Sequence, residues 1–180
     1  MAPEFLSDKE KKILEVDLRR KIYQIVKHYA GSHFREIERK SMLATGSVQY
    51  HLDYLARQEL IKVEKEGNNL RYFSKDFKTE NKKIMGFLRQ KSIRDIILFV
   101  LTHEHCNHEQ IVESVKLSPS TVSWHLRKLE DAHITGFVKK GRKTYYNILV
   151  DKNEIMNLLI TYQESFFDSM VDNIIEMWET

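Results

Sequence analysis

The chain contains the same unit of roughly 60 residues twice, in register at a shift of 74 residues and without a gap. Nine residues beginning at Ser47 align with nine beginning at Thr121, and both runs carry a valine, a His-Leu pair and a final leucine at the same places. Identical residues also recur on either side of this run: Ile22 and Ile96, Val26 and Val100, Ile37 and Ile111, Leu43 and Leu117, Gly67 and Gly141, Tyr72 and Tyr146. Because these identities fall mainly on apolar positions, one supersecondary pattern is used twice.

Length and composition indicate a globular protein with two small domains. Two units of about 60 residues leave an N-terminal extension, a connector and a C-terminal segment within the 180 residues. A hydrophobic fraction of 42% and a charged fraction of 31% are typical of soluble, folded chains. The single cysteine excludes an intramolecular disulfide and favours a reducing compartment. We find no signal peptide and no apolar run long enough to cross a membrane, so we expect a cytoplasmic protein without membrane contact.

The charge is distributed unevenly along the chain. Residues 1–90 carry 19 basic and 13 acidic side chains, a net charge of +6, and residues 91–152 carry 10 and 7, a net charge of +3. Residues 153–180 carry no lysine or arginine and 6 acidic residues, a net charge of −6. A polyanion is therefore attracted to the two repeats and repelled by the C-terminal segment.

Hydrophobic periodicity and capping residues predict three helices and a hairpin in each unit. In the second unit, helices are expected to start near Ser92, Asn107 and Ser118, and strands at 135–139 and 144–148 flank a turn. The first unit repeats this order, with helices predicted over 7–29, 34–40 and 47–58 and a hairpin turn at 66–69. Three helices followed by a hairpin form a winged helix-turn-helix. The predicted fold class is therefore mostly α with small β-hairpin wings.

The third helix of each unit carries a family resemblance. The run Ser-Thr-Val-Ser-Trp-His-Leu-Arg-Lys-Leu-Glu at 120–130 resembles the recognition-helix segment of ArsR/MarR-type winged-helix regulators. The runs His-Phe-Arg-Glu-Ile at 33–37 and Gly-Ser-Val-Gln-Tyr-His-Leu at 46–52 are similar to archaeal tandem winged helix-turn-helix transcription regulators. The predicted organisation is a first winged-helix domain at 1–76, a helical connector at 77–90, a second winged-helix domain at 91–152 and a C-terminal dimerisation helix at 153–180.

The outward side chains of the third helix are the predicted DNA-reading residues. In a helix-turn-helix this helix enters the major groove, where side chains outside the core meet base edges. The set in the second unit is Ser120, Thr121, Ser123, Trp124, Arg127 and Lys128, and in the first unit it is Ser47, Gln49, Tyr50 and Arg57, with Asp53 as an acidic neighbour. Gln49 can pair with adenine, and Arg127 with guanine or a phosphate. The alternative is that these positions are merely solvated.

The two wings differ in charge. The second wing places Lys139, Lys140, Arg142 and Lys143 around one glycine, which suits a hairpin tip lying along a phosphate backbone. The first wing mixes basic with acidic residues, and Arg35, Arg39 and Lys40 on the preceding helix can offset its weaker charge. Charged hairpin tips also occur for solubility alone. We predict DNA contacts from both basic sets, with more of the salt-dependent affinity from the second wing.

The histidines of the sequence predict neither a catalytic site nor a metal site. His51 and His125 precede a core leucine in each unit, and we expect them to pack at the core edge and to hydrogen-bond the preceding helix or the wing. The run His-Glu-His-Cys-Asn-His at 103–108 contains side chains that could ligate Zn²⁺ or Cu⁺. We expect this run to form a short turn in which those side chains do not converge. No cofactor is predicted.

The C-terminal segment has the pattern of a long amphipathic helix. Apolar residues follow one another at steps of three or four: Ile155, Leu159, Tyr162, Phe166, Met170, Ile174 and Met177. A helix of about 25 residues with this face would expose a large apolar surface on a monomer. We therefore predict a homodimer through this helix, and the alternative is that it folds back on its own domains.

Together these features predict a sequence-specific DNA-binding transcription regulator. Its expected partners are double-stranded DNA and the transcription machinery. An enzyme is not predicted, because the sequence has no phosphate loop, nucleophile arrangement or paired carboxylates. The alternative function is a protein-interaction adaptor, since tandem winged helices also occur in complexes such as ESCRT-II that bind no DNA. The basic second wing favours the regulator.

Overall fold

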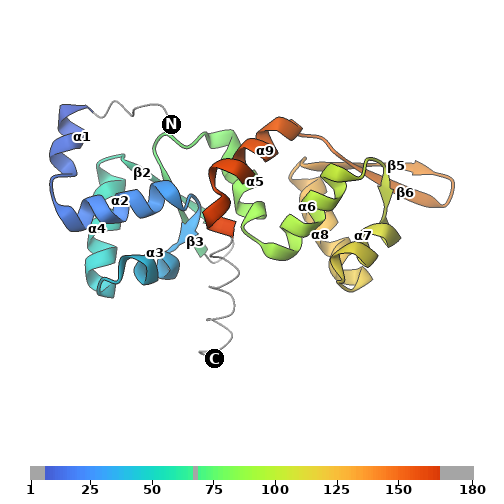
Figure 1. Cartoon of the computed structure of the whole chain (residues 1–180), viewed down its shortest axis with the longest axis horizontal. Helices are drawn as coiled ribbons and strands as arrows, with labels where there is room; N and C mark the ends of the chain where they lie inside the picture. The colour runs from blue at the N-terminus through green and yellow to red at the C-terminus, as the bar shows by residue number, and fades with distance from the viewer. Residues whose placement is uncertain (1–6, 67–68, 167–180) are drawn as a thin grey trace. The chain divides into compact units, whose positions relative to one another are not determined.

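The computed structural model of the chain describes residues 7–66 and 69–166, and its contacts divide the chain into two compact units, Met1–Lys78 and Thr79–Thr180. Both units have the same order of elements (Figure 1). The first contains α1 (Asp8–Ile13), α2 (Asp17–His28), β1 (Ser32–His33), α3 (Phe34–Ser41), α4 (Thr45–Arg57), β2 (Ile61–Glu66) and β3 (Asn69–Ser74). The second contains α5 (Thr79–Leu88), α6 (Lys91–Thr102), β4 (Cys106–Asn107), α7 (His108–Val115), α8 (Pro119–Asp131), β5 (Thr135–Lys140) and β6 (Lys143–Ile148), followed by α9 (Lys152–Thr161).

The sequence repeat is also a structural repeat. Every element from α2 to β3 recurs between α6 and β6 at the same shift of 74 residues. Even the left-handed backbone positions recur, because Met42 and Lys116 end α3 and α7 with φ values of 56° and 55°. Residues other than glycine rarely adopt such φ values, so the surrounding fold imposes these turns. The prediction of two tandem winged helix-turn-helix domains is confirmed.

Each wing belongs to a three-stranded antiparallel sheet. The strand orders are β1-β3-β2 and β4-β6-β5, and Ser32 pairs with Tyr72 as Cys106 pairs with Tyr146. The sequence did not predict β1 and β4, because two residues are too few to show a period. These short strands join the chain just before α3 and α7 to the wing of the same unit, which sets where the wing lies beside the recognition helix.

The recognition helices pack the side chains that the periodicity assigned to the core. Val48, Leu52 and Leu55 of α4 are fully buried, and so are their counterparts on α8, which are Val122, Leu126 and Leu129. In the first unit these residues join a cluster with α2 residues such as Ile22 and Val26. Because one face of each helix is fixed in a core, its opposite face is fixed toward solvent.

The helix predicted over 7–29 is two helices in the structure. α1 ends at Ile13, and the buried Arg19 of α2 donates from Nη1 to the Ile13 carbonyl oxygen at 2.9 Å. In the second unit, Arg94 donates in the same way to the Leu88 carbonyl oxygen at the end of α5, also at 2.9 Å. Each arginine satisfies a carbonyl that a helix end leaves free. The helix predicted in the connector is thus the counterpart of α1 and packs within the second unit.

The apolar stripe of the C-terminal segment is partly covered by the second unit itself. Instead of one unbroken helix from 153, the structure ends α9 at Thr161, has a turn at Tyr162 and is helical again over 163–166. Ile155 and Phe166 are buried, α9 packs on α5, and the Arg94 guanidinium lies 5.5 Å from the Phe166 ring centroid. Of the other predicted dimerisation residues, Leu159 and Tyr162 are half-buried, and Met170, Ile174 and Met177 lie outside the described residues.

Candidate nucleic-acid interface

The structure exposes most of the predicted reading side of α8. Ser120, Ser123, Trp124 and Arg127 are exposed, whereas Thr121 and Lys128 are half-buried. The Ser118 hydroxyl accepts the backbone N–H of Thr121 at 3.1 Å and lies 2.8 Å from the Thr121 hydroxyl. The Ser118 hydroxyl also lies 2.9 Å from the Ser120 hydroxyl, so these side chains are joined at the capped start of the helix. Ser123, Trp124 and Arg127 are the exposed predicted side chains beyond this cluster.

Trp124 and Lys128 form a pair on this face of α8. The Lys128 ammonium lies 3.7 Å from the centroid of the Trp124 ring, in the geometry of a cation–π contact. The Trp124 side chain remains 55% exposed, so the indole is a large flat surface beside the polar residues. This arrangement offers both a positive charge and a stacking surface.

The second wing presents four cations at its tip. Lys139, Lys140, Arg142 and Lys143 are all exposed, and none of them has an acidic partner among residues 7–66 and 69–166. Gly141 between them has a φ of +63°, which glycine adopts readily and other residues adopt with strain. The glycine makes the tight turn that gathers the four charges at one end of the hairpin.

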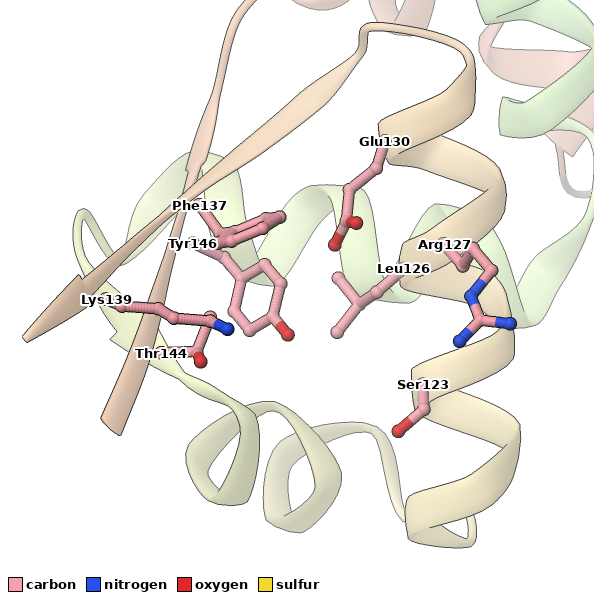
Figure 2. Close-up of a pocket in the computed structure, with 8 residues that line it drawn as sticks. All are labelled: Ser123, Leu126, Arg127, Glu130, Phe137, Lys139, Thr144 and Tyr146. Atoms are coloured by element: carbon pink, nitrogen blue, oxygen red, sulfur yellow. The ribbon is translucent and has the colours of Figure 1, made fainter. Parts of the chain in front are cut away.

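A groove runs between α8 and the second wing. It consists of two cavities of about 230 and 320 Å³, which share Ser123, Thr144 and Tyr146 in their walls. Figure 2 shows Phe137 and Tyr146 projecting from the wing strands toward α8, and Glu130 on the helix side. Partial burial raises the pKa of Glu130, and the nearby Asp131 adds to this effect. The groove combines an aromatic floor with basic residues at its edges.

The side chain of His108 lies against the recognition helix. Its Nε2 atom is 2.9 Å from the Ser123 hydroxyl oxygen, so α7 and α8 are joined at an outward position. The sequence placed His108 only in the histidine-rich run, and the equivalent residue of the first unit is Phe34. The signal that could have found the contact is its position directly after the Asn107 cap, which starts α7 beside α8.

The reading side of α4 is organised by a contact within the helix. Gln49, Tyr50, Asp53 and Arg57 are exposed, and Ser47 is half-buried. The Gln49 amide donates from Nε2 to the Asp53 carboxylate at 2.9 Å, and Arg57 donates from Nε to the Asp53 backbone carbonyl at 3.3 Å. These side chains form one stripe along the helix, with an acidic residue in its middle.

The basic residues of α3 are less available than the sequence suggested. Arg35 is exposed, but Arg39 and Lys40 are half-buried. The Lys40 ammonium lies 3.9 Å from the centroid of the Tyr29 ring, so it already has a partner within the unit. Of the three predicted contacts on α3, Arg35 is the one that faces solvent most openly.

The first wing is less basic than the second. Its exposed cations are Lys62 and Lys65, whereas Arg71 donates from Nη1 to the Gly31 carbonyl oxygen at 2.9 Å and so supports the sheet. Both wings expose apolar side chains: Val63 is 40% and Leu70 is 46% exposed on the first, and Phe137 is 48% and Val138 is 50% exposed on the second. This wing therefore offers little of the dense positive charge that marks its counterpart.

The two repeated histidines are buried behind the recognition helices. His51 and His125 pack at the core as predicted, but the Nδ1 atom of each has no hydrogen-bond partner within the described chain. The expected hydrogen bond is thus not found at that atom. Burial lowers the pKa of both imidazoles, and the positive charges of Arg19 and Lys128, respectively, lower it further.

The histidine-rich run does not gather into a ligand set. The His103 ring stacks on Phe99 with centroids 4.2 Å apart, Cys106 is buried in β4, and His108 contacts α8. Burial raises the pKa of the Cys106 thiol, which disfavours the thiolate that binds metals. Within residues 7–66 and 69–166, no three histidine, cysteine, aspartate or glutamate residues are grouped to hold a metal.

The two units match two helix-turn-helix families. Residues 16–85 match the family described as an N-terminal HTH domain, and residues 91–140 match the arsR family of bacterial regulatory proteins. The fold and these matches define the class, which is that of proteins with two tandem helix-turn-helix domains. More particularly, the first domain is similar to the family described as an N-terminal HTH domain, and the second is similar to the arsR family.

A relative of known sequence agrees with this class. A protein of Methanocaldococcus jannaschii, named an uncharacterized HTH-type transcriptional regulator, is 28% identical over 139 residues, which are 77% of this chain and 35% of that protein. The chain thus spans about a third of the length of this relative. The structure is also similar to a crystal structure of human N-acetylserotonin methyltransferase in complex with SAM, at 8% sequence identity. The match covers 74% of this chain and 45% of the methyltransferase chain. Its TM-score of 0.28 is too low to support any argument.

The helices of both units are short. In the part of the chain that the structure describes, none is long and apolar enough to cross a membrane.

Proposed function

We propose that the protein is a sequence-specific, DNA-binding regulator of transcription. The observation that carries this proposal is the second unit, where the exposed side of α8 lies across a groove from four cations that have no acidic partner in the described chain. Dense positive charge beside a recognition helix is the electrostatic pattern of a duplex-binding surface. The proposed activity is binding to double-stranded DNA, without a catalytic step.

The geometry supports a division of labour within the second unit. α8 would enter the major groove and present Ser123, Trp124 and Arg127 to base edges. The wing tip would follow the phosphate backbone, where each neutralised phosphate contributes about 0.9 to the dependence of log K on log salt concentration. Base contacts would select the sequence, and wing contacts would supply affinity.

We also propose a homodimer, with a refined view of the surface that forms it. Because Ile155 and Phe166 are already buried in their own unit, they are poor contacts for a second copy in this conformation. The exposed apolar residues of α9 are Met156, at 44%, and Ile160, at 67%. They lie one helical turn apart and so form a continuous face. A dimeric regulator would act on the chromosome in the cytoplasm, together with the transcription machinery.

The homodimer can be tested by sedimentation equilibrium of the intact chain and of Ile160→Asp. An aspartate on an apolar contact face would oppose association, because the charge would have to leave water. We expect the variant to be monomeric at concentrations where the natural chain is dimeric. A monomeric natural chain would contradict the proposal.

A second candidate function has support in the first unit. Its wing exposes two cations against four on the second wing, and its recognition helix carries the exposed Asp53, so this unit suits a protein partner better than a polyanion. Under this alternative the chain would be an interaction adaptor. Salt-dependent binding to DNA separates the two functions, because an adaptor has no reason to show it.

The deciding experiment removes the charge of the second wing. In a chain with Lys139, Lys140, Arg142 and Lys143 all changed to glutamine, we expect the salt slope of DNA binding to fall by up to about 3 to 4. The measurement is the affinity for duplex DNA over a range of salt concentrations.

The matched control is a chain in which four other exposed cations, Lys9, Lys12, Lys78 and Lys83, are changed to glutamine. It loses the same net charge but leaves the wing intact, so its slope should change little. If the natural chain shows no salt-dependent binding, the adaptor is favoured.

A further inference from the structure

We propose that Asp53 is a specificity-determining residue, because it holds the Gln49 amide in the orientation that reads adenine and rejects guanine. This inference rests on the proposed DNA binding and deepens it for the first unit. It arises from one contact on α4, the 2.9 Å hydrogen bond from Gln49 Nε2 to Asp53 Oδ1.

The contact lies on the face that α4 presents outward. Gln49 and Asp53 are both exposed and are four residues apart, so their side chains meet one turn along the helix. Their neighbours Val48 and Leu52 have no exposed surface. The helix therefore cannot turn about its axis to hide the pair, and anything bound along this face meets the Gln49 amide.

The chemistry of the carboxylate decides which way the amide points. An ionised aspartate can only accept hydrogen bonds, so it must face the amide nitrogen of Gln49 and not the amide oxygen. One N–H is occupied by this bond. The Gln49 oxygen and the second N–H remain available, which leaves one acceptor and one donor for a base.

This remaining pair fits only one purine. Adenine presents the N7 acceptor and the N6 amino donor in the major groove, which match the free N–H and the oxygen of Gln49. Guanine presents two acceptors, N7 and O6, so its O6 would face the amide oxygen without a hydrogen atom between them. An amide free to rotate could instead offer both of its N–H groups to guanine.

The charge of Asp53 has a separate effect. Arg57 donates to the backbone carbonyl of Asp53, and no cation within the described ranges pairs with the carboxylate. An unneutralised carboxylate beside DNA weakens binding to every sequence by repelling phosphates. Charge therefore acts on all duplexes alike, whereas the orientation of Gln49 acts at one base pair, and the two effects can be measured apart.

The second unit lacks this device. The residues at the equivalent places are Ser123 and Arg127, and the Ser123 hydroxyl is held by His108 from another helix. The proposed choice of adenine over guanine is therefore a property of the first unit alone, and changes in α8 should not remove it.

The experiment starts with selection of bound duplexes from a random-sequence pool by the intact chain. The affinities of the natural chain and of Asp53→Asn are then measured for the selected duplex and for each single base-pair substitution. We expect the natural chain to prefer A·T over G·C at one base pair by on the order of tenfold. In Asp53→Asn this preference should fall to about twofold or less, while the affinity for all duplexes rises.

A double-mutant cycle identifies the route of the effect. In a Gln49→Ala background, Asp53→Asn should leave the A·T to G·C ratio unchanged, because there is no amide left to orient. The inference is overturned if Asp53→Asn keeps the preference, or if it changes the ratio equally in the Gln49→Ala background. If the natural chain binds no DNA, the proposed function fails as well. Failure of the Asp53 inference alone leaves DNA binding intact, so the two outcomes can be told apart. Unfolding in urea checks that the exposed substitutions leave the fold intact.

Discussion

The two units of this protein share a framework and differ on the surface that the framework carries. From α2 to β3 and from α6 to β6 each element returns after 74 residues, and the buried residues of α4 recur on α8. The outward faces have diverged. On α4 an acidic residue holds Gln49, whereas on α8 a histidine from a neighbouring helix holds Ser123.

The comparison shows that the winged-helix framework determines which residue positions face outward, but not which side chains occupy them. A core of apolar side chains determines which positions face outward, and it is indifferent to the polar residues placed there. The second wing carries four exposed cations, whereas the first carries two, and both wings expose apolar side chains. The two units are therefore suited to unequal shares of one binding event.

The largest expected effect tests whether the frameworks are equal. Leu55 and Leu129 are equivalent and fully buried, so Leu55→Ala and Leu129→Ala should each lower the free energy of unfolding by about 3 kcal/mol. Urea unfolding followed by circular dichroism measures both. The matched controls are the exposed Leu70→Ala and Leu149→Ala, which should cost less than about 1 kcal/mol. Strongly unequal losses at the two buried sites would show that the units do not share one framework.

The next effect tests whether the wings are unequal. Changing Lys62 and Lys65 of the first wing to glutamine should lower the salt slope by at most about 2, less than the change of up to about 3 to 4 expected for the four second-wing cations. The measurement is again the DNA affinity over a range of salt concentrations. A first-wing effect as large as that of the second wing would break the proposed division.

A smaller effect concerns the way the second unit holds its recognition helix. His108→Ala removes the hydrogen bond to Ser123 and should weaken binding to the selected duplex by about 1 kcal/mol. Binding to an unrelated duplex should change less, because the contact positions a base-reading side chain. In the first unit Phe34→Ala is no equivalent test, since Phe34 packs against the core cluster. Equal losses for both duplexes would mean that His108 acts on affinity alone.

The smallest expected effect is a shared pH dependence of stability. Burial lowers the folded-state pKa of His51 and His125 below the value near 6.5 that the unfolded chain has. The unfolded chain therefore binds protons first, so stability is complete above pH about 6.5 and declines as the pH falls from there through the lower folded-state pKa. Urea midpoints at pH 7.5 and 5.5 measure the decline.

The double variant His51→Gln and His125→Gln, which cannot titrate at these positions, should lose part of that decline. The single variants His51→Gln and His125→Gln should each reduce the decline. If only one of them does, the two histidines are not equivalent despite their repeated place. If neither does, the pH dependence comes from other groups.

Much of the fold could be predicted because its signals are local. The caps at Asn107 and Ser118 and the apolar spacing of α8 predicted helix starts that the structure reproduces within a residue or two. The break between α1 and α2 could not be predicted in this way. It depends on Arg19 reaching back to the Ile13 carbonyl, a contact between two helices that leaves no period in the sequence.

The features of the candidate interface also separate into those that local sequence signals could predict and those that depend on tertiary contacts. Exposure of Trp124, Arg127 and the second-wing cations follows from periodicity and from one glycine, so the sequence could predict it. The half-burial of Arg39 and Lys40 could not be predicted, because it depends on how α3 packs on the rest of its unit. The contact between His108 and Ser123 could not be predicted either, because the two residues are 15 positions apart in the sequence.

The sequence by itself determined that this protein is a duplicated winged helix-turn-helix with a basic second wing. It could do so because periodicity, caps, turn residues and charge are properties of neighbouring residues. Only the tertiary structure decided how the outward side chains are held, that α5 is the counterpart of α1, and that Ile155 and Phe166 are covered by their own unit. Those facts depend on contacts between residues that are distant in the sequence. Burial and hydrogen bonding decide between arrangements that the local sequence pattern does not distinguish.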